Sequence, residues 1–254
     1  MTDKLKQIVD RAGSTLMAEW WMFYRPYFNS DNECLNFIYS TIKDEQITDE
    51  SICEVEPGIY ELKDGRRIYD KDFIPRRMLN TVMRMVSAAR DIEQIRRGKD
   101  VFKIVFLVTC VETLQKLSGE DSQKKKLLFE FFRGYTSEKD KKYIRKHFAR
   151  GTQGLYEDED AFEQFVGVLN EYRNCAAHEG EYWDYCFKNC SGRTPMSIIV
   201  KINLENYSSK NKKEHIFETT LSYKKFESIY VHTCINFIRK YTAEQHKETA
   251  NADA

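Results

Sequence analysis

Residues 171–180 read Glu-Tyr-Arg-Asn-Cys-Ala-Ala-His-Glu-Gly, which brings Arg173, Asn174 and His178 close together in the chain. The planar guanidinium of arginine binds two phosphate oxygens at once, and an amide orients a partner through hydrogen bonds. Histidine exchanges a proton near neutral pH because its ordinary pKa is about 6.5. The segment therefore predicts a site that binds phosphate and moves a proton, with these three residues as candidate catalytic groups.

Cleavage of RNA without a metal ion is the reaction that uses such groups. The 2′-hydroxyl attacks the adjacent phosphorus, so a base must take its proton, an acid must protonate the leaving oxygen, and a cation must stabilise the transition state. One chain offers only His178 in this setting. We therefore expect a symmetric homodimer in which two copies of the segment face each other. The small residues 175–177 would let another helix approach closely.

The spacing of arginine and histidine is weak evidence by itself, because Arg239 and His246 match a similar pattern. Two features distinguish Arg173 from Arg239. An amide follows Arg173, and the helix predicted to carry it has an apolar face. Arg239 instead precedes Lys240 and a polar tail, where its histidine would be loosely held.

The segment also has a purely structural interpretation. Arg173 would pair with Glu171 or Glu179, and His178 would cap the C-terminus of a helix, where the helix dipole favours a cation. The sequence leaves this alternative open.

A metal site is disfavoured in the same region. The spacing of His178, Cys186 and Cys190 is not that of a common zinc module, and a fourth ligand is not evident. We therefore expect neither a metal ion nor a cofactor. The aromatic residues within 182–185 could stack on a base, but a place in the core or in the dimer interface is the favoured interpretation.

Apolar residues at helical spacing predict a mainly α-helical chain. The predicted helices cover 3–24, 31–43, 76–97, 101–118, 122–133, 138–149, 159–177 and 223–241. Two stretches of alternating apolar and polar residues predict β-hairpins over 58–69 and 196–222, the first with an Asp-Gly turn. The tail 243–254 is polar and is predicted to be disordered.

A basic run precedes the candidate site in the chain. Its members are Lys139, Lys141, Lys142, Arg145, Lys146 and Arg150. Such a run is either a surface that receives an RNA backbone or a solvated helix face. We take Lys139, Lys142, Arg145, Lys146 and Arg150 as candidate RNA-binding residues. RNA binding must be local, because 40 basic and 40 acidic side chains leave no net charge.

The cysteines and the N-terminal residues also indicate the cellular compartment in which the protein works. The seven cysteines are scattered and no secretory signal precedes them, so we expect reduced thiols and a cytoplasmic protein. Segment 101–114 is apolar but contains Lys103 and Glu112, and it is too short and too charged to span a bilayer. No membrane partner is expected.

Segment 173–178 resembles the Arg-polar-x(3–5)-His signature of the HEPN superfamily, a group of helical domains that includes many ribonucleases. The order of an apolar helix carrying Glu112, short helices, the signature helix and a closing helix is also similar to that fold. The resemblance covers 99–242, with 196–222 as an insertion and 1–98 as an N-terminal helical extension with a hairpin.

The resemblance implies a HEPN-like helical bundle with two β-hairpin insertions. It further implies a homodimeric endoribonuclease that needs no cofactor, acting as a toxin with an antitoxin partner or as an effector of anti-phage defence. Glu112 and Glu171 are candidate supporting residues, although Glu112 equally fits a buried acid paired with a nearby base. Two alternatives remain: a non-catalytic HEPN-like module that binds RNA or protein, and an unrelated helical interaction protein.

Overall fold

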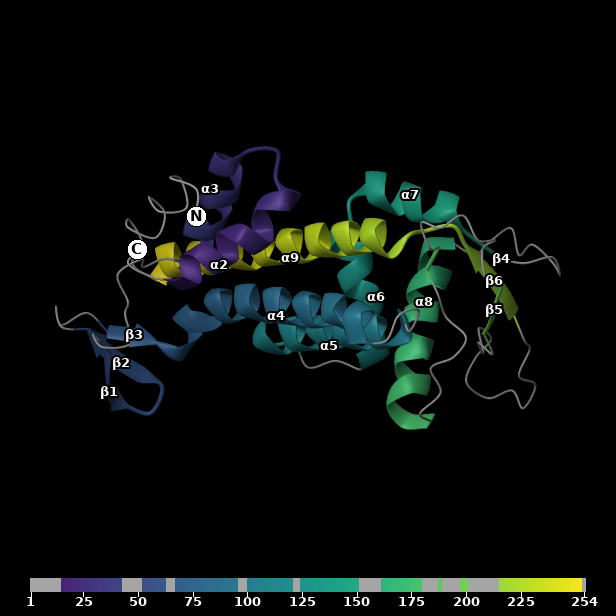
Figure 1. Ribbon diagram of the computed structural model, residues 1–254. Helices are drawn as coiled ribbons and strands as arrows, with labels where there is room; N and C mark the ends of the chain where they lie inside the picture. Colours follow the sequence, from purple (N-terminus) through teal and green to yellow (C-terminus); the bar gives the residue numbers. More distant parts are fainter. Residues whose placement is uncertain are drawn as a thin grey trace. The chain divides into compact units, whose positions relative to one another are not determined.

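The computed structural model is mainly helical, as the sequence predicts (Figure 1). It describes residues 15–42, 52–62, 67–95, 100–120, 124–150, 161–179, 187–188, 197–200 and 215–252. The chain divides into two compact units, Met1–Met83 with Ile235–Ala254, and Arg84–Cys234. The sequence predicts a boundary near residue 98, whereas this division falls within α4 (Ile74–Ile95) and within α9 (Tyr223–Ala252).

The first unit contains two helices and a small sheet before α4. These elements are α2 (Thr15–Tyr24), η1 (Arg25–Tyr27), α3 (Asp31–Thr41), β1 (Ile52–Glu56), β2 (Ile59–Leu62), β3 (Arg67–Tyr69) and η3 (Asp70–Phe73). The helix predicted over 3–24 is confirmed for 15–24, and its earlier residues lie outside the described ranges. It ends just before Pro26, which occupies a short 3₁₀ turn.

Aromatic side chains fill the core of this unit. Trp20 and Tyr24 on α2 are fully buried, and each donates a hydrogen bond to α4. Trp20 Nε1 donates to Asn80 Oδ1 at 2.8 Å, and the Tyr24 hydroxyl donates to the Leu79 carbonyl at 3.0 Å. These bonds satisfy the polar atoms of two large buried rings, so the rings can be buried at little cost.

The buried face of α3 differs from the predicted one. The sequence predicts a stripe through Leu35, Ile38 and Ile42, but the buried residues are Cys34, Phe37, Ile38 and Thr41. The large ring of Phe37 packs against those of Tyr24 and Phe28 and thereby sets the rotation of the helix. Leu35 and Ile42 are consequently only half-buried.

Strands β1, β2 and β3 form an antiparallel sheet in that order. In the β2–β3 pair, Ile59 lies opposite Tyr69 and Glu61 lies opposite Arg67. The predicted Asp-Gly turn at 64–65 lies outside the described residues. Strand β1 is an additional partner that the sequence pattern did not indicate, and Gly58 makes its turn into β2 with a φ of 76°.

The second unit is built on helices α5 to α9 with a second small sheet. The elements are α5 (Asp100–Leu117), α6 (Lys124–Tyr135), α7 (Glu138–His147), β4 (Phe148–Arg150), α8 (Ala161–Asn174), η4 (Cys175–Glu179), β5 (Ser197–Val200) and β6 (His215–Thr219). Strand β6 lies between β4 and β5, and both pairings are antiparallel. The residues between β5 and β6 lie outside the described ranges.

The core of the second unit follows the predicted apolar faces of α8 and α9. Phe165 on α8 packs edge-on against Phe226 on α9, and Phe226 stacks on Phe187 at a centroid distance of 5.1 Å. The Tyr230 hydroxyl donates to the Leu107 carbonyl at 2.8 Å, which fixes α9 against α5. The sequence therefore identified these packing faces correctly.

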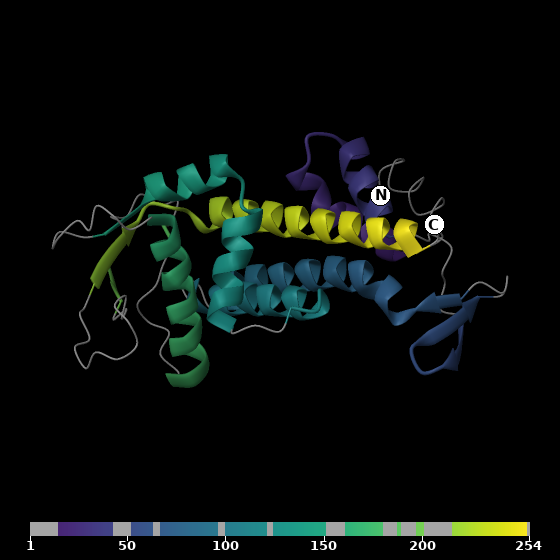
Figure 2. The ribbon, with the colours of Figure 1, turned by 180° about the vertical axis from the view of Figure 1, so that it is seen from behind.

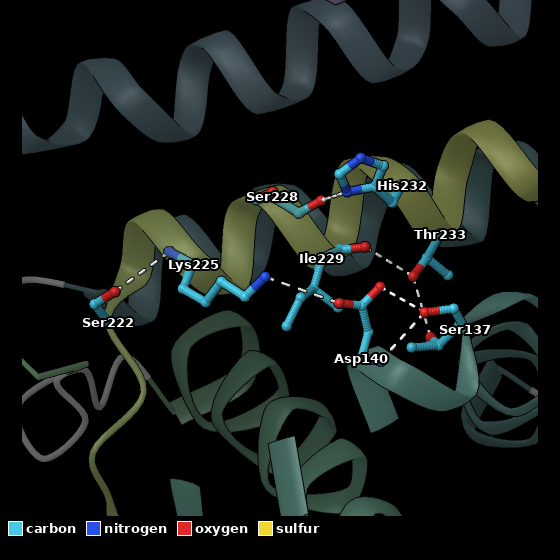
Figure 3. Close-up of polar contacts among 9 residues, drawn as sticks. Ser137, Asp140, Ser222, Lys225, Ser228, Ile229, His232 and Thr233 are labelled. Carbon is cyan, nitrogen blue, oxygen red and sulfur yellow. Dashed lines mark hydrogen bonds and ion pairs between the residues drawn. The ribbon is translucent and has the colours of Figure 1, made fainter. Parts of the chain in front are cut away.

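The first turn of α7 is fixed by a cap and by α9 (Figure 3). The sequence, with Asp140 three residues after Ser137, predicts a cap of the capping-box kind. The Ser137 hydroxyl accepts a hydrogen bond from the Asp140 amide at 3.2 Å, which confirms the cap. The same hydroxyl donates to Asp140 Oδ2 at 2.7 Å, and Asp140 Oδ1 lies 3.9 Å from Lys225 Nζ on α9. These contacts set the direction in which α7 presents its exposed face.

Two of the differences between predicted and observed helix ends have a clear physical reason. Helix α7 ends at His147 instead of 149, because residues 148–150 pair with β6 as strand β4. Helix α9 continues to Ala252, so the prediction of a disordered tail is wrong for 243–252. That stretch lacks large apolar residues but is rich in Ala, Glu, Gln and Lys, which favour a helix, and Lys240 pairs with Glu244.

None of the described helices is long and apolar enough to cross a membrane.

Candidate functional site

Arg173 lies at the end of α8 and is held by Glu112 of α5. Its Nη2 donates to both carboxylate oxygens of Glu112, at 2.6 and 2.8 Å. The arginine side chain is 12% exposed and the glutamate side chain 20% exposed. Limited contact with water strengthens the attraction between the charges, so the ion pair fixes the guanidinium firmly.

Asn174 supports the same guanidinium from the next position in the chain. Arg173 Nη1 donates to Asn174 Oδ1 at 3.1 Å. The amide is therefore an acceptor for the arginine, as the sequence suggested. A guanidinium carries five N–H donors. Three are used here, which leaves two donors of Arg173 without a partner among the described residues.

Helices α5 and α8 bring these residues together through their apolar neighbours. Val108 and Val111 on α5, like Leu169 on α8, are almost completely buried. Helix α5 contacts both α8 and the segment after it. Glu112 follows Val111 directly and lies within the mainly apolar middle of α5. The expectation that Glu112 is an acid paired with a nearby base is confirmed, and that base is Arg173. Its supporting role in a site stays a prediction.

The ion-pair partner of Arg173 differs from the one that the structural interpretation of the sequence suggested. The sequence suggested Glu171 or Glu179, but the ion pair is made with Glu112, 61 residues away in the chain. Glu171 is half-buried on α8, and the side chain of Glu179 is outside the described part of the structure. The preference for Glu112 follows from tertiary packing, which sequence spacing does not show.

The chain changes from an α-helix to a π-helix directly after Asn174, and this segment, η4, contains His178. The sequence argument placed Asn174 and His178 on one face because they are four residues apart. A π-helix has a wider turn than an α-helix. That Asn174 and His178 share a face stays a prediction, because the His178 side chain lies outside the described part of the structure. Single π-turns are frequent at functional sites. The structure places the backbone of His178 in this turn and does not describe its side chain.

Small side chains cover the described surface of the turn. Cys175 and Ala176 are half-buried and Ala177 is exposed. The three described side chains beside Asn174 are therefore all small, and that of Ala177 is exposed.

We compared the chain with protein-family models, curated proteins and solved structures. None of them matches. The site is consequently interpreted from its own geometry and from the resemblance of segment 173–178 to the HEPN signature.

The predicted RNA-binding residues are not beside Arg173. Lys139, Lys142, Arg145 and Lys146 lie on α7, and the guanidinium of Arg145 lies over the ring of Phe162 at the start of α8. Arg173 is near the opposite end of α8, about 16 Å from Phe162 along the helix axis. Figures 1 and 2 show α7 beside the start of α8 and away from its end. Arg150 lies in β4, and its side chain is not described.

A buried charge network near the start of α5 was missed by the sequence analysis. Lys103, with a side chain only 4% exposed, contacts Asp100 at 2.7 Å and Glu93 at 2.5 Å. Burial alone would lower the pKa of Lys103, but hydrogen bonds to Asp100 and Glu93 outweigh it and raise the pKa above its ordinary value. Asp100 Oδ2 also accepts a hydrogen bond from the Phe187 amide at 2.7 Å, which anchors Phe187 against α5.

The remaining sequence candidates have other roles or lie outside the described ranges. Arg239 lies over the rings of Phe28 and Phe37, in agreement with its dismissal as a site residue. The described residues contain no cluster that could hold a metal ion. Cys186, Cys190 and the aromatic residues within 182–185 lie outside the described ranges.

Proposed function

We propose that this protein is a metal-independent endoribonuclease of the HEPN type that acts as a homodimer. One observation carries the proposal. Arg173 is fixed by Glu112 and Asn174 at the point where α8 widens into the π-turn that contains His178. The three residue types that the chemistry needs are thus gathered at one helix end.

The proposed reaction is attack by a 2′-hydroxyl on the neighbouring phosphorus. His178 of one protomer takes the hydroxyl proton, the bond between phosphorus and the 5′-oxygen breaks, and His178 of the other protomer protonates that oxygen. The products are a 2′,3′-cyclic phosphate and a free 5′-hydroxyl. The two unused donors of Arg173 bind the phosphate oxygens, on which negative charge develops.

Glu112 acts as a positioning residue in this scheme. An arginine side chain is flexible, and holding it in one conformation removes an entropic cost from the reaction. The ion pair also lowers the net charge of the site, so Arg173 contributes less to the initial attraction of RNA than to orientation in the transition state.

The dimer is supported by the half-buried Cys175 and Ala176 and the exposed Ala177 beside the site. Small side chains allow two helices to approach closely around a two-fold axis. A single chain supplies one histidine in this position, so each protomer contributes half of the acid–base pair.

The resemblance extends the proposal to biology. We propose that the protein is a toxin controlled by an antitoxin partner, or an effector of anti-phage defence, and that it works in the cytoplasm. Cys34, Cys110 and Cys234 are free thiols, as expected in a reducing compartment.

The test is incubation of the purified protein with structured RNA and with tRNA in the presence of EDTA. Wild-type protein is expected to cleave and to leave 2′,3′-cyclic phosphate ends. Arg173→Ala and His178→Ala are expected to lose cleavage, while Arg239→Ala and His246→Ala, the second match to the pattern, retain it. Cleavage that survives both Arg173→Ala and His178→Ala would contradict the site assignment.

A second candidate function is a non-catalytic HEPN-like module that dimerises and binds RNA or protein. The observation in its favour is the same ion pair, because Glu112 neutralises Arg173 and leaves it only 12% exposed. Absence of cleavage by a wild-type protein that still dimerises would support this second function.

A further inference from the structure

A pair of packed rings lies at the end of α7, which Figures 1 and 2 show near the start of α8 and away from the end that carries Arg173. Tyr143 and His147 pack with ring centroids 4.3 Å apart and an angle of 31° between the ring planes. His147 Nδ1 lies 2.8 Å from the Thr220 hydroxyl, which fixes the ring. Nε2 of His147 has no partner within the described part of the chain and is available to a ligand.

Positive side chains surround this pair. Lys146 precedes His147 on α7, and the charges of Lys146 and Lys188 both act on its ring. Lys225 on α9 lies 4.9 Å from the centre of the Tyr143 ring. Lys146 and Lys188 are exposed and have no ion pair with any described residue. Lys146 and Lys188 therefore carry positive charge that no described acidic side chain neutralises.

The nearby acidic groups are already engaged. Asp140 Oδ1 lies 3.9 Å from Lys225 Nζ, and Asp140 Oδ2 accepts a hydrogen bond from the Ser137 hydroxyl (Figure 3). Glu138 binds Lys141 at 2.7 Å. Neither acid reaches the exposed lysines of α7, so the helix presents a positive face.

The lysines of α7 form a line. Lys139, Lys142 and Lys146 are all exposed and recur at the spacing of one helix face. They extend over roughly 10 Å, the rise of seven helical residues. A line of separate cations fits the repeated phosphates of a polymer better than it fits one small anion.

The backbone around the cluster is fixed in advance. The His147 carbonyl accepts the Thr220 amide at 2.8 Å, and the Lys188 amide donates to the Leu221 carbonyl at 2.9 Å. Phe187, next to Lys188, is held by the buried Asp100. His147 and Lys188 are thus held in place by backbone contacts with the residues that follow β6 and by the buried Asp100.

We propose that Tyr143, His147, Lys146 and Lys188, together with the α7 lysines, form a docking site for the phosphate backbone of single-stranded RNA. His147 Nε2, Lys146 and Lys188 hold one phosphate, and Lys142 and Lys139 hold those that follow. The choice of RNA as the polyanion rests on the proposed function. The site lies apart from the reacting groups, so it selects and retains substrate without taking part in bond cleavage.

Protonation of His147 is coupled to this docking. Burial, followed by the charges of Lys146 and Lys188, lowers the pKa of His147 from its ordinary value. A bound phosphate opposes the charge of the lysines and favours the imidazolium. RNA should consequently bind more tightly as the pH falls, with uptake of a proton by His147.

The test measures binding of a fluorescein-labelled oligouridine of about 12 nucleotides by fluorescence anisotropy. All proteins in the test carry Arg173→Ala, so that the oligonucleotide is not cleaved during the measurement. Lys146→Gln with Lys188→Gln is expected to weaken binding about tenfold and to reduce the slope of log K against log salt by about 1.4. The matched control is Lys126→Gln with Lys240→Gln, which removes two exposed lysines elsewhere and should leave binding unchanged. Thermal melting checks that each variant is folded.

The pH arm compares the parent protein with His147→Gln. The parent should bind about threefold or more tightly at pH 6 than at pH 8, and His147→Gln should lose this dependence. In NMR titrations the pKa of His147 should rise when the oligonucleotide is added. The half-buried His232, whose Nδ1 lies 2.7 Å from the Ser228 carbonyl, serves as internal reference.

Unchanged affinity and salt slope in the double lysine variant would overturn the proposal, as would pH dependence that survives His147→Gln. The surface would be assigned to a membrane instead if the protein bound phosphatidylserine vesicles and did not bind the oligonucleotide, and if the double lysine variant lost the vesicle binding. Failure of the proposed function is distinguishable, because it would appear as wild-type protein that binds the oligonucleotide normally and does not cleave RNA.

Discussion

At the scale of single residues, the central contact is the ion pair between Arg173 and Glu112. It joins two helices that are far apart in the sequence, and it leaves part of the guanidinium available for a ligand. In the proposed function the same contact serves both stability and chemistry. Substitutions at Glu112 should separate these two roles, because the glutamate is proposed to orient the arginine without touching RNA.

Glu112→Gln is predicted to lower kcat for RNA cleavage at least about tenfold with little change in KM. Without the glutamate, Arg173 continues to bind phosphate but is poorly oriented for the reaction. It should also destabilise the fold by about 1–3 kcal/mol, because Arg173 loses its counter-charge in a partly buried position. Steady-state kinetics and urea unfolding measure the two effects. The control is Glu163→Gln, which removes an ion pair with the more exposed Arg133. An increase in KM with unchanged kcat would contradict the positioning role.

His147 gives a stability prediction whose sign follows from its lowered pKa. The unfolded chain binds a proton near pH 6.5, and the folded chain binds it only at lower pH. The contribution of His147 to the free energy of unfolding is therefore fully present above its pKa in the unfolded chain. It falls as the pH drops through about 6.5 and levels off below the pKa of His147 in the folded protein. Unfolding free energies of wild type and His147→Gln, measured from pH 8 to pH 5, should converge as the pH falls. A wild-type protein that gains stability relative to the variant on acidification would contradict this.

At the scale of elements, helix ends hold the second unit together. Ser137 caps α7, and Asp100 at the start of α5 binds both Lys103 and the Phe187 amide. The buried network is more consequential than the exposed cap. Its loss would leave a charge without compensation in the interior.

Lys103→Met is predicted to destabilise the protein by about 3–5 kcal/mol, because Asp100 would remain buried without its cation. Lys126→Met, at an exposed position of α6, should change stability by less than about 0.5 kcal/mol. Ser137→Ala should cost about 1 kcal/mol through loss of the cap. Chemical denaturation measures all three. A Lys103→Met protein as stable as wild type would show that the network does not support the fold.

The sequence was sufficient for what local pattern determines. It predicted the helices, the apolar faces of α8 and α9, and the cap at Ser137, because periodicity and capping depend on neighbouring residues. It did not predict the partner of Arg173, the rotation of α3 or the π-turn after Asn174. Each of these depends on packing between segments distant in the chain. The exposed helix at 243–252 was missed because helix propensity without an apolar face resembles disorder.

At the scale of the whole molecule, the account requires two protomers. Ala177 is exposed beside the site, so a large charged side chain there should block a partner while leaving the protomer folded. Ala177→Arg is predicted to convert the dimer to a monomer and to abolish RNA cleavage. Ala243→Arg, an equivalent change on the exposed end of α9, should do neither. Sedimentation and cleavage assays measure both effects, and an active monomeric Ala177→Arg protein would refute the shared site.

Subunit mixing tests the central claim most directly. Wild-type protein is mixed with His178→Ala in varying proportions, allowed to exchange subunits, and assayed for RNA cleavage in EDTA. If both histidines of a dimer are needed, activity follows the square of the wild-type fraction, and an equal mixture retains about a quarter of full activity. Activity that falls in direct proportion to the wild-type fraction would show that each protomer acts alone and would contradict the composite site.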